Sequence, residues 1–221
     1  MIKVVVLDFD GVIVDSNALK ERAFYDLFPG AGEVHALIKT VLSDNRYGTR
    51  LDILREILEG QGKGASEIEA LVPVYAAQYN NQVQRGIFDL GVSVEVRKTL
   101  TRLRQRYRLY LNSGTYAPAL SETVENLKIG HFFQKAYGRP PFKEENLREI
   151  LTFEKAFSRE VVVVGDGEED YQSATAFHCP FIAIANGFND WGKRQVPLAS
   201  SLLQVPELVA SLESEQVSHE S

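Results

Sequence analysis

Four short apolar runs recur along the chain, and the last three each follow a stretch with helical periodicity. The runs cover Ile2 to Leu7, Tyr107 to Leu111, Val161 to Val164 and Phe181 to Ala185. Continuous β-branched and apolar residues of this length are typical of strands that are covered on both faces of a sheet. Helices that alternate with such strands predict an α/β fold with a doubly wound, parallel, Rossmann-like sheet.

The stretch from residue 16 to residue 85 has a different character. Four amphipathic helical patterns follow one another there without a strand pattern between them. The third pattern stops at Gly60, and the fourth opens with Ser66 and Glu69 at the spacing of a capping box. Pro73 is expected to kink the fourth helix or to mark its first turn. We therefore expect two domains: residues 1–15 with 86–221 as the α/β core, and residues 16–85 as a helical cap over the carboxyl ends of the strands.

The composition restricts the partners and the compartment. The net charge of −6 argues against non-specific binding of nucleic acid, which needs a basic face. The single cysteine, Cys179, excludes an internal disulfide and a multi-cysteine zinc site, and it fits a reducing cytoplasm. The first apolar run is too short for a signal peptide or a membrane span. We expect a cytoplasmic monomer or homodimer that binds neither nucleic acid nor membranes.

Carboxylates follow two of the predicted strands. Asp8 and Asp10 come where the first strand ends, and Gly11 allows the chain to turn sharply there. Asp166 and Asp170 come after the third strand. Like charges gathered at a strand end are costly unless a cation accompanies them, and a site made of oxygen ligands favours Mg²⁺. Asp8 and Asp10 could instead belong to a simple polar turn, but the recurrence of acids after another strand favours a metal site.

These motifs resemble those of the haloacid dehalogenase superfamily, in the branch that carries a helical cap after the first motif. The segment from Asp8 to Val12 resembles the first motif of the family, and Asp166 with Asp170 resembles the last. Ser113 follows the second predicted strand and matches the hydroxyl residue of the middle motif. The resemblance extends from Ile2 to about Gly187, with the motifs in family order.

The lysine of the family has its best match in Lys143, at the start of a predicted helix. One departure concerns this position, because many relatives have a lysine followed directly by proline. Here Pro140 and Pro141 precede Lys143, and Arg139 is a competing cation. A lysine can shift its pKa and pair with a carboxylate, which favours Lys143. The alternative is that Lys143 is a solvated residue at a helix start.

The resemblance implies covalent catalysis with magnesium. Asp8 would be the nucleophile that takes the phosphoryl group. Asp10 would protonate the leaving oxygen and then deprotonate the attacking water. The Mg²⁺ ligands would be Asp8, the backbone carbonyl of Asp10, and Asp166. Asp170 would either bind the metal directly or hold Lys143.

The resemblance also assigns the groups that hold the phosphoryl oxygens. These would be the side chains of Ser113 and Lys143 and the backbone N–H groups of Phe9 and Gly114. For Ser113 the alternative is a hydroxyl that only caps the turn after the strand, since Ser-Gly-Thr is common turn chemistry.

Asp10 distinguishes among the reactions of the superfamily. A dehalogenase needs the nucleophile but no acid for a leaving alkoxide, so Asp10 favours phosphoryl transfer from an oxygen ester. The predicted function is that of a Mg²⁺-dependent phosphatase acting on a small phosphate monoester, such as a sugar phosphate. A mutase of the β-phosphoglucomutase type is an alternative, although those relatives usually have a histidine where this chain has Lys20. A binding protein that has the fold without activity is a second alternative.

The cap is expected to select the substrate, because the core contacts only the phosphate. Lys20, Arg46 and Arg50 are the candidate substrate contacts in the cap, since their cations could meet a second anionic group. The alternative is that these residues belong to a solvated face.

Overall fold

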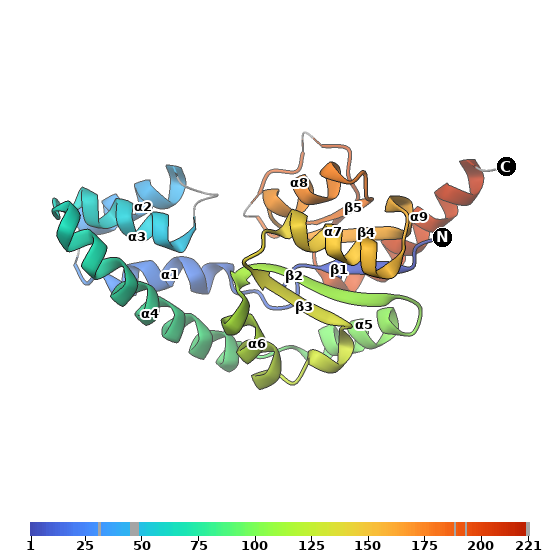
Figure 1. Ribbon diagram of the computed structural model, residues 1–221, viewed down its shortest axis with the longest axis horizontal. Coiled ribbons are helices and arrows are strands. Elements are labelled where there is room, and N and C mark those ends of the chain that lie inside the picture. Colours follow the sequence, from blue (N-terminus) through green and yellow to red (C-terminus); the bar gives the residue numbers. More distant parts are fainter. Residues whose placement is uncertain (31, 45–48, 188, 193, 220–221) are drawn as a thin grey trace. The chain divides into compact units, whose positions relative to one another are not determined.

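The computed structural model of the protein describes residues 1–30, 32–44, 49–187, 189–192 and 194–219 (Figure 1). The chain divides into two compact units. The core unit comprises Met1–Asp15 and Leu90–Ser221, and the helical unit comprises Ser16–Asp89. The expected domain boundary after residue 85 falls within helix α4 (Ala65–Leu90), whose last residue begins the second part of the core unit.

Within the described residues, the core unit contains one sheet of six strands in the order β3-β2-β1-β4-β5-β6, and all of its neighbours pair in parallel. This confirms the predicted α/β fold with a doubly wound parallel sheet. The central strand β1 is completely buried, as its run of valines predicts. The strands are β1 (Val4–Leu7), β2 (Arg108–Tyr116), β3 (Lys135–Arg139), β4 (Val161–Gly165), β5 (Phe181–Ile184) and β6 (Leu198–Ala199).

Helices cover both faces of this sheet. Figure 1 shows α7 (Lys143–Glu154) and α8 (Glu168–Ala176) on one side, and α5 (Val94–Arg104) and α6 (Ala117–Asn126) on the other. The last helix, α9 (Val205–His219), contacts α5. A buried apolar cluster fills the layer between the sheet and the pair α7 and α8. Its members include Val4, Val6, Tyr110, Leu147, Ile150, Val161, Val163, Ala174, Phe181 and Trp191.

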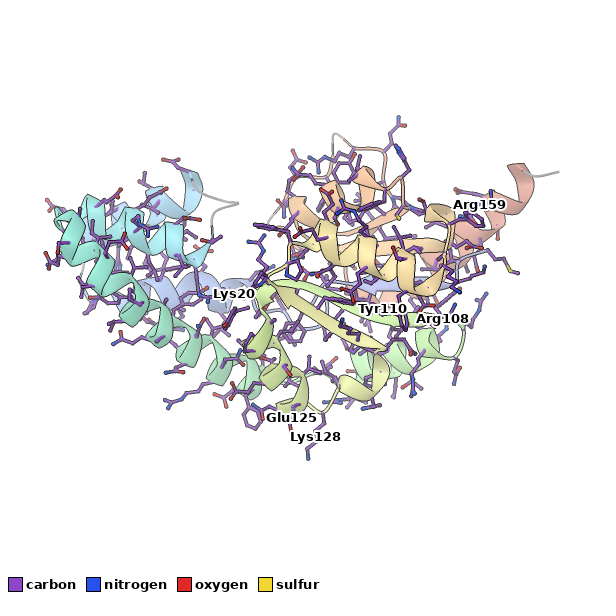
Figure 2. All side chains as sticks on the ribbon, in the orientation of Figure 1. Lys20, Arg108, Tyr110, Glu125, Lys128 and Arg159 are labelled. Atoms are coloured by element: carbon purple, nitrogen blue, oxygen red, sulfur yellow. The ribbon has the colours of Figure 1, made fainter. Side chains whose placement is uncertain are left out.

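The C-terminal end of α7 is attached to β2 by Glu154. The Nε atom of Arg108 lies 2.7 Å from Glu154 Oε2, and the hydroxyl group of Tyr110 donates a hydrogen bond to the other carboxylate oxygen. Figure 2 shows Arg108 and Tyr110 near this end of α7. Burial, reinforced by the Glu154 carboxylate, raises the pKa of Tyr110, so this phenol stays protonated and donates. Helix α7, which begins with Lys143, is therefore held against β2 at its C-terminal end.

The helical unit contains α1 (Asn17–Leu27), α2 (Glu33–Asp44), α3 (Arg50–Gly60) and most of α4. The ring of Phe24 in α1 lies 4.6 Å from that of Tyr79 in α4, which illustrates how the apolar stripes meet. Helix α4 begins at Ala65, so Ser66 lies within its first turn and the predicted capping box is wrong. Pro73 lies inside α4 and does not mark its first turn. None of the helices in the described part of the chain is long and apolar enough to cross a membrane.

Three details of the sheet differ from the prediction. Strand β3 was not predicted, because it contains Gly138 and has basic residues at both ends instead of an apolar run. Strand β6 has only two residues, which is too short for a sequence pattern. Strand β2 continues to Tyr116, so Ser113 lies within this strand rather than after it.

The close packing of β3 against the start of α6 leads to a stability prediction at Gly138. A Cβ atom on this residue would lie 2.6 Å from both the Cα atom of Ala117 and the carbonyl oxygen of Thr115. Because backbone atoms cannot give way as a side chain can, Gly138→Ala should lower the free energy of unfolding by about 1–3 kcal/mol. Urea unfolding followed by the fluorescence of Trp191 measures this change. Gly64→Ala is the control, since no atom lies within 4 Å of its added Cβ; equal stability of the two variants would contradict the prediction.

Candidate active site

The candidate site lies at the carboxyl ends of β1 and β4, where the strand order reverses. The two strands are neighbours in the sheet, with Leu7 opposite Val164. The N–H group of Asp8 continues the pairing by donating to the carbonyl oxygen of Val164 at 2.9 Å. The residues that follow the two strands therefore leave the sheet at the same edge. Open α/β sheets bind their ligands at such a switch point.

Three buried carboxylates converge at this edge. Asp8, Asp166 and Asp170 each offer a carboxylate oxygen, and these oxygens lie within 4.8 Å of one another. Asp170 can approach because Gly165 has no side chain: a Cβ atom there would lie 2.2 Å from Asp170 Cγ. Asn186, which sequence reasoning missed, donates to Asp166 Oδ2 at 2.6 Å. The structure thus brings together three of the four predicted metal-binding residues through their side chains.

Lys143 carries a positive charge into the carboxylate cluster. Its Nζ atom lies 2.7 Å from Asp170 Oδ1 and 3.1 Å from Asp8 Oδ1, and the residue is 4% exposed. A lysine this deeply buried needs such partners to keep its charge. The competing cation, Arg139, pairs instead with Glu169 at 2.5 Å. The structure therefore places Lys143, and not Arg139, against the first acidic motif.

The electrostatics of the cluster are those of a site that attracts a cation. Burial raises the pKa of Asp8 well above its ordinary value, and although Lys143 opposes this shift, the neighbouring carboxylates add to it. Burial likewise raises the pKa of Asp170 to about 6, against the opposing effect of Lys143. Burial alone would lower the pKa of Lys143, but the charges of Asp170 and Asp8 outweigh it and raise that pKa. Because the acids crowd one another and offer only oxygen ligands, their donor set fits Mg²⁺.

Two buried amides fix the backbone at Lys143. The Nδ2 atom of Asn112 donates to the carbonyl oxygen of Lys143 at 2.9 Å, and Asn146 Nδ2 donates to Asn112 Oδ1 at 3.0 Å. The Asn146 amide also donates to the carbonyl oxygen of Pro141. In the opposite amide orientation, the side-chain oxygen of Asn146 would face the oxygen atoms of Asn112 and Pro141. Sequence reasoning missed both residues, because the two partners lie 34 positions apart and the motifs assign neither of them a role.

The Asp10 carboxylate is buried beside the other acids, but it is not one of the three that converge. Its Oδ2 atom accepts a hydrogen bond of 2.9 Å from the hydroxyl group of Thr115. The Oγ atom of Ser113 lies 3.5 Å from the same oxygen. The predicted metal contact of Asp10 involves its backbone carbonyl and not this carboxylate. That contact stays a prediction. Thr115 is a further residue that sequence reasoning missed.

The four predicted phosphoryl ligands belong to the same edge of the core unit. Ser113 is fully buried near the end of β2, and Gly114 is the exposed residue that follows it. The N–H group of Phe9 donates to Asp8 Oδ1 at 2.7 Å. Lys143 completes the group from the first turn of α7. Their role in binding a phosphoryl group stays a prediction.

The predicted substrate contacts belong to the helical unit. Lys20 lies in α1, where its carbonyl oxygen accepts a hydrogen bond from the hydroxyl group of Tyr79. Arg50 is the first residue of α3. Arg46 lies outside the described residues. The contribution of all three to substrate selection stays a prediction.

Comparisons with known proteins agree with this fold and these motifs. Residues 5–184 match the family model described as haloacid dehalogenase-like hydrolase. A curated relative, a phosphoglycolate phosphatase from Aliivibrio fischeri, is 24% identical over 197 residues, which cover 85% of this chain and 86% of that protein.

Solved structures of the same fold include enzymes of more than one kind. A haloacid dehalogenase-like hydrolase from Streptococcus pneumoniae superposes with a TM-score of 0.73 and 20% identity, covering 94% of this chain and 98% of that one. A β-phosphoglucomutase from Clostridium difficile superposes with a TM-score of 0.74 and 16% identity, covering 98% and 99%. At these identities the likeness shows the fold alone. The match of the family model over most of the chain shows more: the protein belongs to the haloacid dehalogenase-like hydrolase family.

Proposed function

We propose that the protein is a Mg²⁺-dependent phosphatase that hydrolyses a small phosphate monoester through an aspartyl-phosphate intermediate. The observation that carries this proposal is the contact of Lys143 with both Asp8 and Asp170 inside a cluster of three buried carboxylates. An anionic substrate needs such a cation, because the carboxylates alone would repel it. The relative named as a phosphoglycolate phosphatase supports the same class of reaction.

The metal would be held by the side chains of Asp8, Asp166 and Asp170 and by the backbone carbonyl of Asp10. When bound, Mg²⁺ supplies positive charge that offsets the charge of the phosphoryl oxygens and of the acids. Asp170 already contacts Lys143 at 2.7 Å, so it also positions this lysine. Lys143 and Ser113 would bind the phosphoryl oxygens in the orientation that Asp8 requires.

The chemistry proceeds in two displacements at phosphorus. In the first, a carboxylate oxygen of Asp8 bonds to phosphorus while the bond from phosphorus to the leaving oxygen breaks, and Asp10 gives a proton to that oxygen. In the second, water bonds to phosphorus and its proton passes to Asp10. The bond between phosphorus and Asp8 breaks, which releases inorganic phosphate and regenerates the free carboxylate.

A phosphate-ester panel tests this proposal and identifies the substrate. The purified full chain would be assayed with Mg²⁺ against 4-nitrophenyl phosphate, phosphoglycolate, sugar phosphates and nucleotides. Release of inorganic phosphate from at least one monoester supports the proposal. Conversion of a sugar phosphate into its positional isomer without phosphate release would instead support the mutase alternative. Absence of turnover across the panel would support a binding protein.

Removal of the metal should abolish turnover. Because three buried carboxylates crowd together at the site, we expect treatment with EDTA to reduce phosphate release to background and added Mg²⁺ to restore it. Added Mg²⁺ should also raise the melting temperature of the EDTA-treated protein, since a ligand that binds the folded state stabilises it. Full activity in EDTA would contradict the metal requirement.

A further inference from the structure

Thr115 lies beside the acid–base residue of the proposed reaction, although the motifs assign it no role. Its hydroxyl group donates a hydrogen bond of 2.9 Å to Asp10 Oδ2. Asp10 itself is 7% exposed and lies in the short loop after β1, where Gly11 adopts a positive φ of 74°. A side chain on such a loop needs partners from a rigid element to keep one orientation, and Thr115 belongs to strand β2.

The local geometry of β2 directs Thr115 towards Asp10. The hydroxyl groups of Thr115 and Ser113 both approach Asp10 Oδ2, at 2.9 and 3.5 Å. The register between β2 and β3 shifts between Asn112 and Tyr116, and such an irregularity changes the direction of the side chains within it. The N–H group of Thr115 donates to Ser113 Oγ at 3.1 Å, which links the two hydroxyl residues.

The two hydroxyl groups differ in how closely they engage Asp10. Thr115 Oγ1 lies 2.9 Å from the Oδ2 atom, an ordinary hydrogen bond, whereas Ser113 Oγ lies 3.5 Å away, at the limit of one. The stronger contact is made by the residue that is branched at Cβ, whose χ1 angle is restricted. Thr115 is thus suited to orient the acid, and Ser113 remains suited to contact a phosphoryl oxygen.

We infer that Thr115 is a positioning residue that holds the Asp10 carboxyl group in the orientation needed to protonate the leaving oxygen. This inference rests on the proposed phosphatase function and deepens it. Its consequence depends on the substrate. An alkyl phosphate releases a strongly basic alkoxide that needs the proton, whereas 4-nitrophenyl phosphate releases a stable phenolate that does not.

The test compares kcat/KM of Thr115→Val on 4-nitrophenyl phosphate with that on an alkyl phosphate that the wild type hydrolyses. Because kcat/KM reports the first displacement, we expect a loss on the order of 10- to 100-fold for the alkyl ester and a loss below about threefold for the aryl ester. Thr115→Ser keeps the hydroxyl group and should recover most of the alkyl activity. Thr152→Val is the control, because the hydroxyl group of Thr152 donates to a helix carbonyl far along α7. This variant should leave the ratio of kcat/KM for the two esters unchanged.

A double-mutant cycle with Asp10→Asn shows whether Thr115 acts through Asp10. The Asp10→Asn variant should show the same bias between the two esters, and adding Thr115→Val should cause little further loss on the alkyl ester. Equal losses on both esters, no loss at all, or full additivity would overturn the inference. If Thr115→Val does not fold, Thr115→Ala carries the same prediction with the same readouts. A wild-type protein without turnover of any phosphate ester would overturn the proposed function itself, which is a distinct result.

Discussion

The Asp8→Asn variant is expected to fold normally and to lose phosphatase activity by at least about a thousandfold. An amide is too weak a nucleophile to displace the leaving group, although it keeps the shape of the carboxylate. Phosphate release from the best ester of the panel, measured with Mg²⁺, gives the size of the loss. Asp89→Asn makes the same chemical change at an exposed position of the helical unit and should retain full activity.

The direction in which Asp8→Asn changes the stability of the metal-free protein can also be predicted. Folding raises the pKa of Asp8, so this group costs stability as the pH rises from the ordinary pKa to the raised one, and above the raised value the cost stays constant. Asn carries no charge and avoids this cost. The melting temperature of Asp8→Asn without metal should therefore equal or exceed that of the wild type. A variant that unfolds, or one that retains normal turnover, would contradict the role of Asp8.

Lys143→Met is expected to abolish activity and also to destabilise the fold. Lys143 lies within 3.1 Å of two buried carboxylates, and methionine would leave both without their cation. Breaking a buried ion pair by removing one partner costs about 3–5 kcal/mol. Urea unfolding of the metal-free protein measures this change, since bound Mg²⁺ would offset part of it.

Lys3→Met provides the matched control for the lysine variant. Lys3 also pairs with a carboxylate, Glu160, at 2.6 Å, but its side chain is 53% exposed. Exposed pairs of this kind contribute about 0–1 kcal/mol, so the control should be nearly as stable as the wild type and fully active. Similar losses of stability in the two variants would contradict the structural importance of the buried ion pairs of Lys143.

The α/β fold and the location of the acids were predictable because both depend on local patterns. A buried parallel strand needs a continuous apolar run, and such runs mark β1 and β4 in the sequence. The carboxyl ends of parallel neighbours meet at one edge, so acids that follow these two strands must come close together. That β1 and β4 are neighbours is not a local pattern, so the assignment of Asp8 and Asp166 to one site came from the resemblance to the haloacid dehalogenase superfamily.

The residues that orient the site were not predictable, because their roles depend on contacts that are distant in the sequence. Asn112, Asn146 and Thr115 act through partners that are distant in the sequence, and each looks like an ordinary polar residue of a strand or helix. The direction of Thr115 depends on an irregular register between β2 and β3, which no periodicity reveals. Strand β3 itself escaped prediction because Gly138 interrupts its apolar pattern, although the close approach of α6 requires that glycine.

The stereochemical course at phosphorus tests the aspartyl-phosphate intermediate most directly. Each in-line displacement inverts the configuration, so transfer to Asp8 followed by attack of water gives net retention. The measurement uses a phosphate ester made chiral with oxygen isotopes, with sulfur in place of one oxygen, and analyses the configuration of the released phosphate. It does not require the intermediate to accumulate. Retention is the predicted result, and inversion, which indicates one direct attack by water, would contradict the role of Asp8 as the nucleophile.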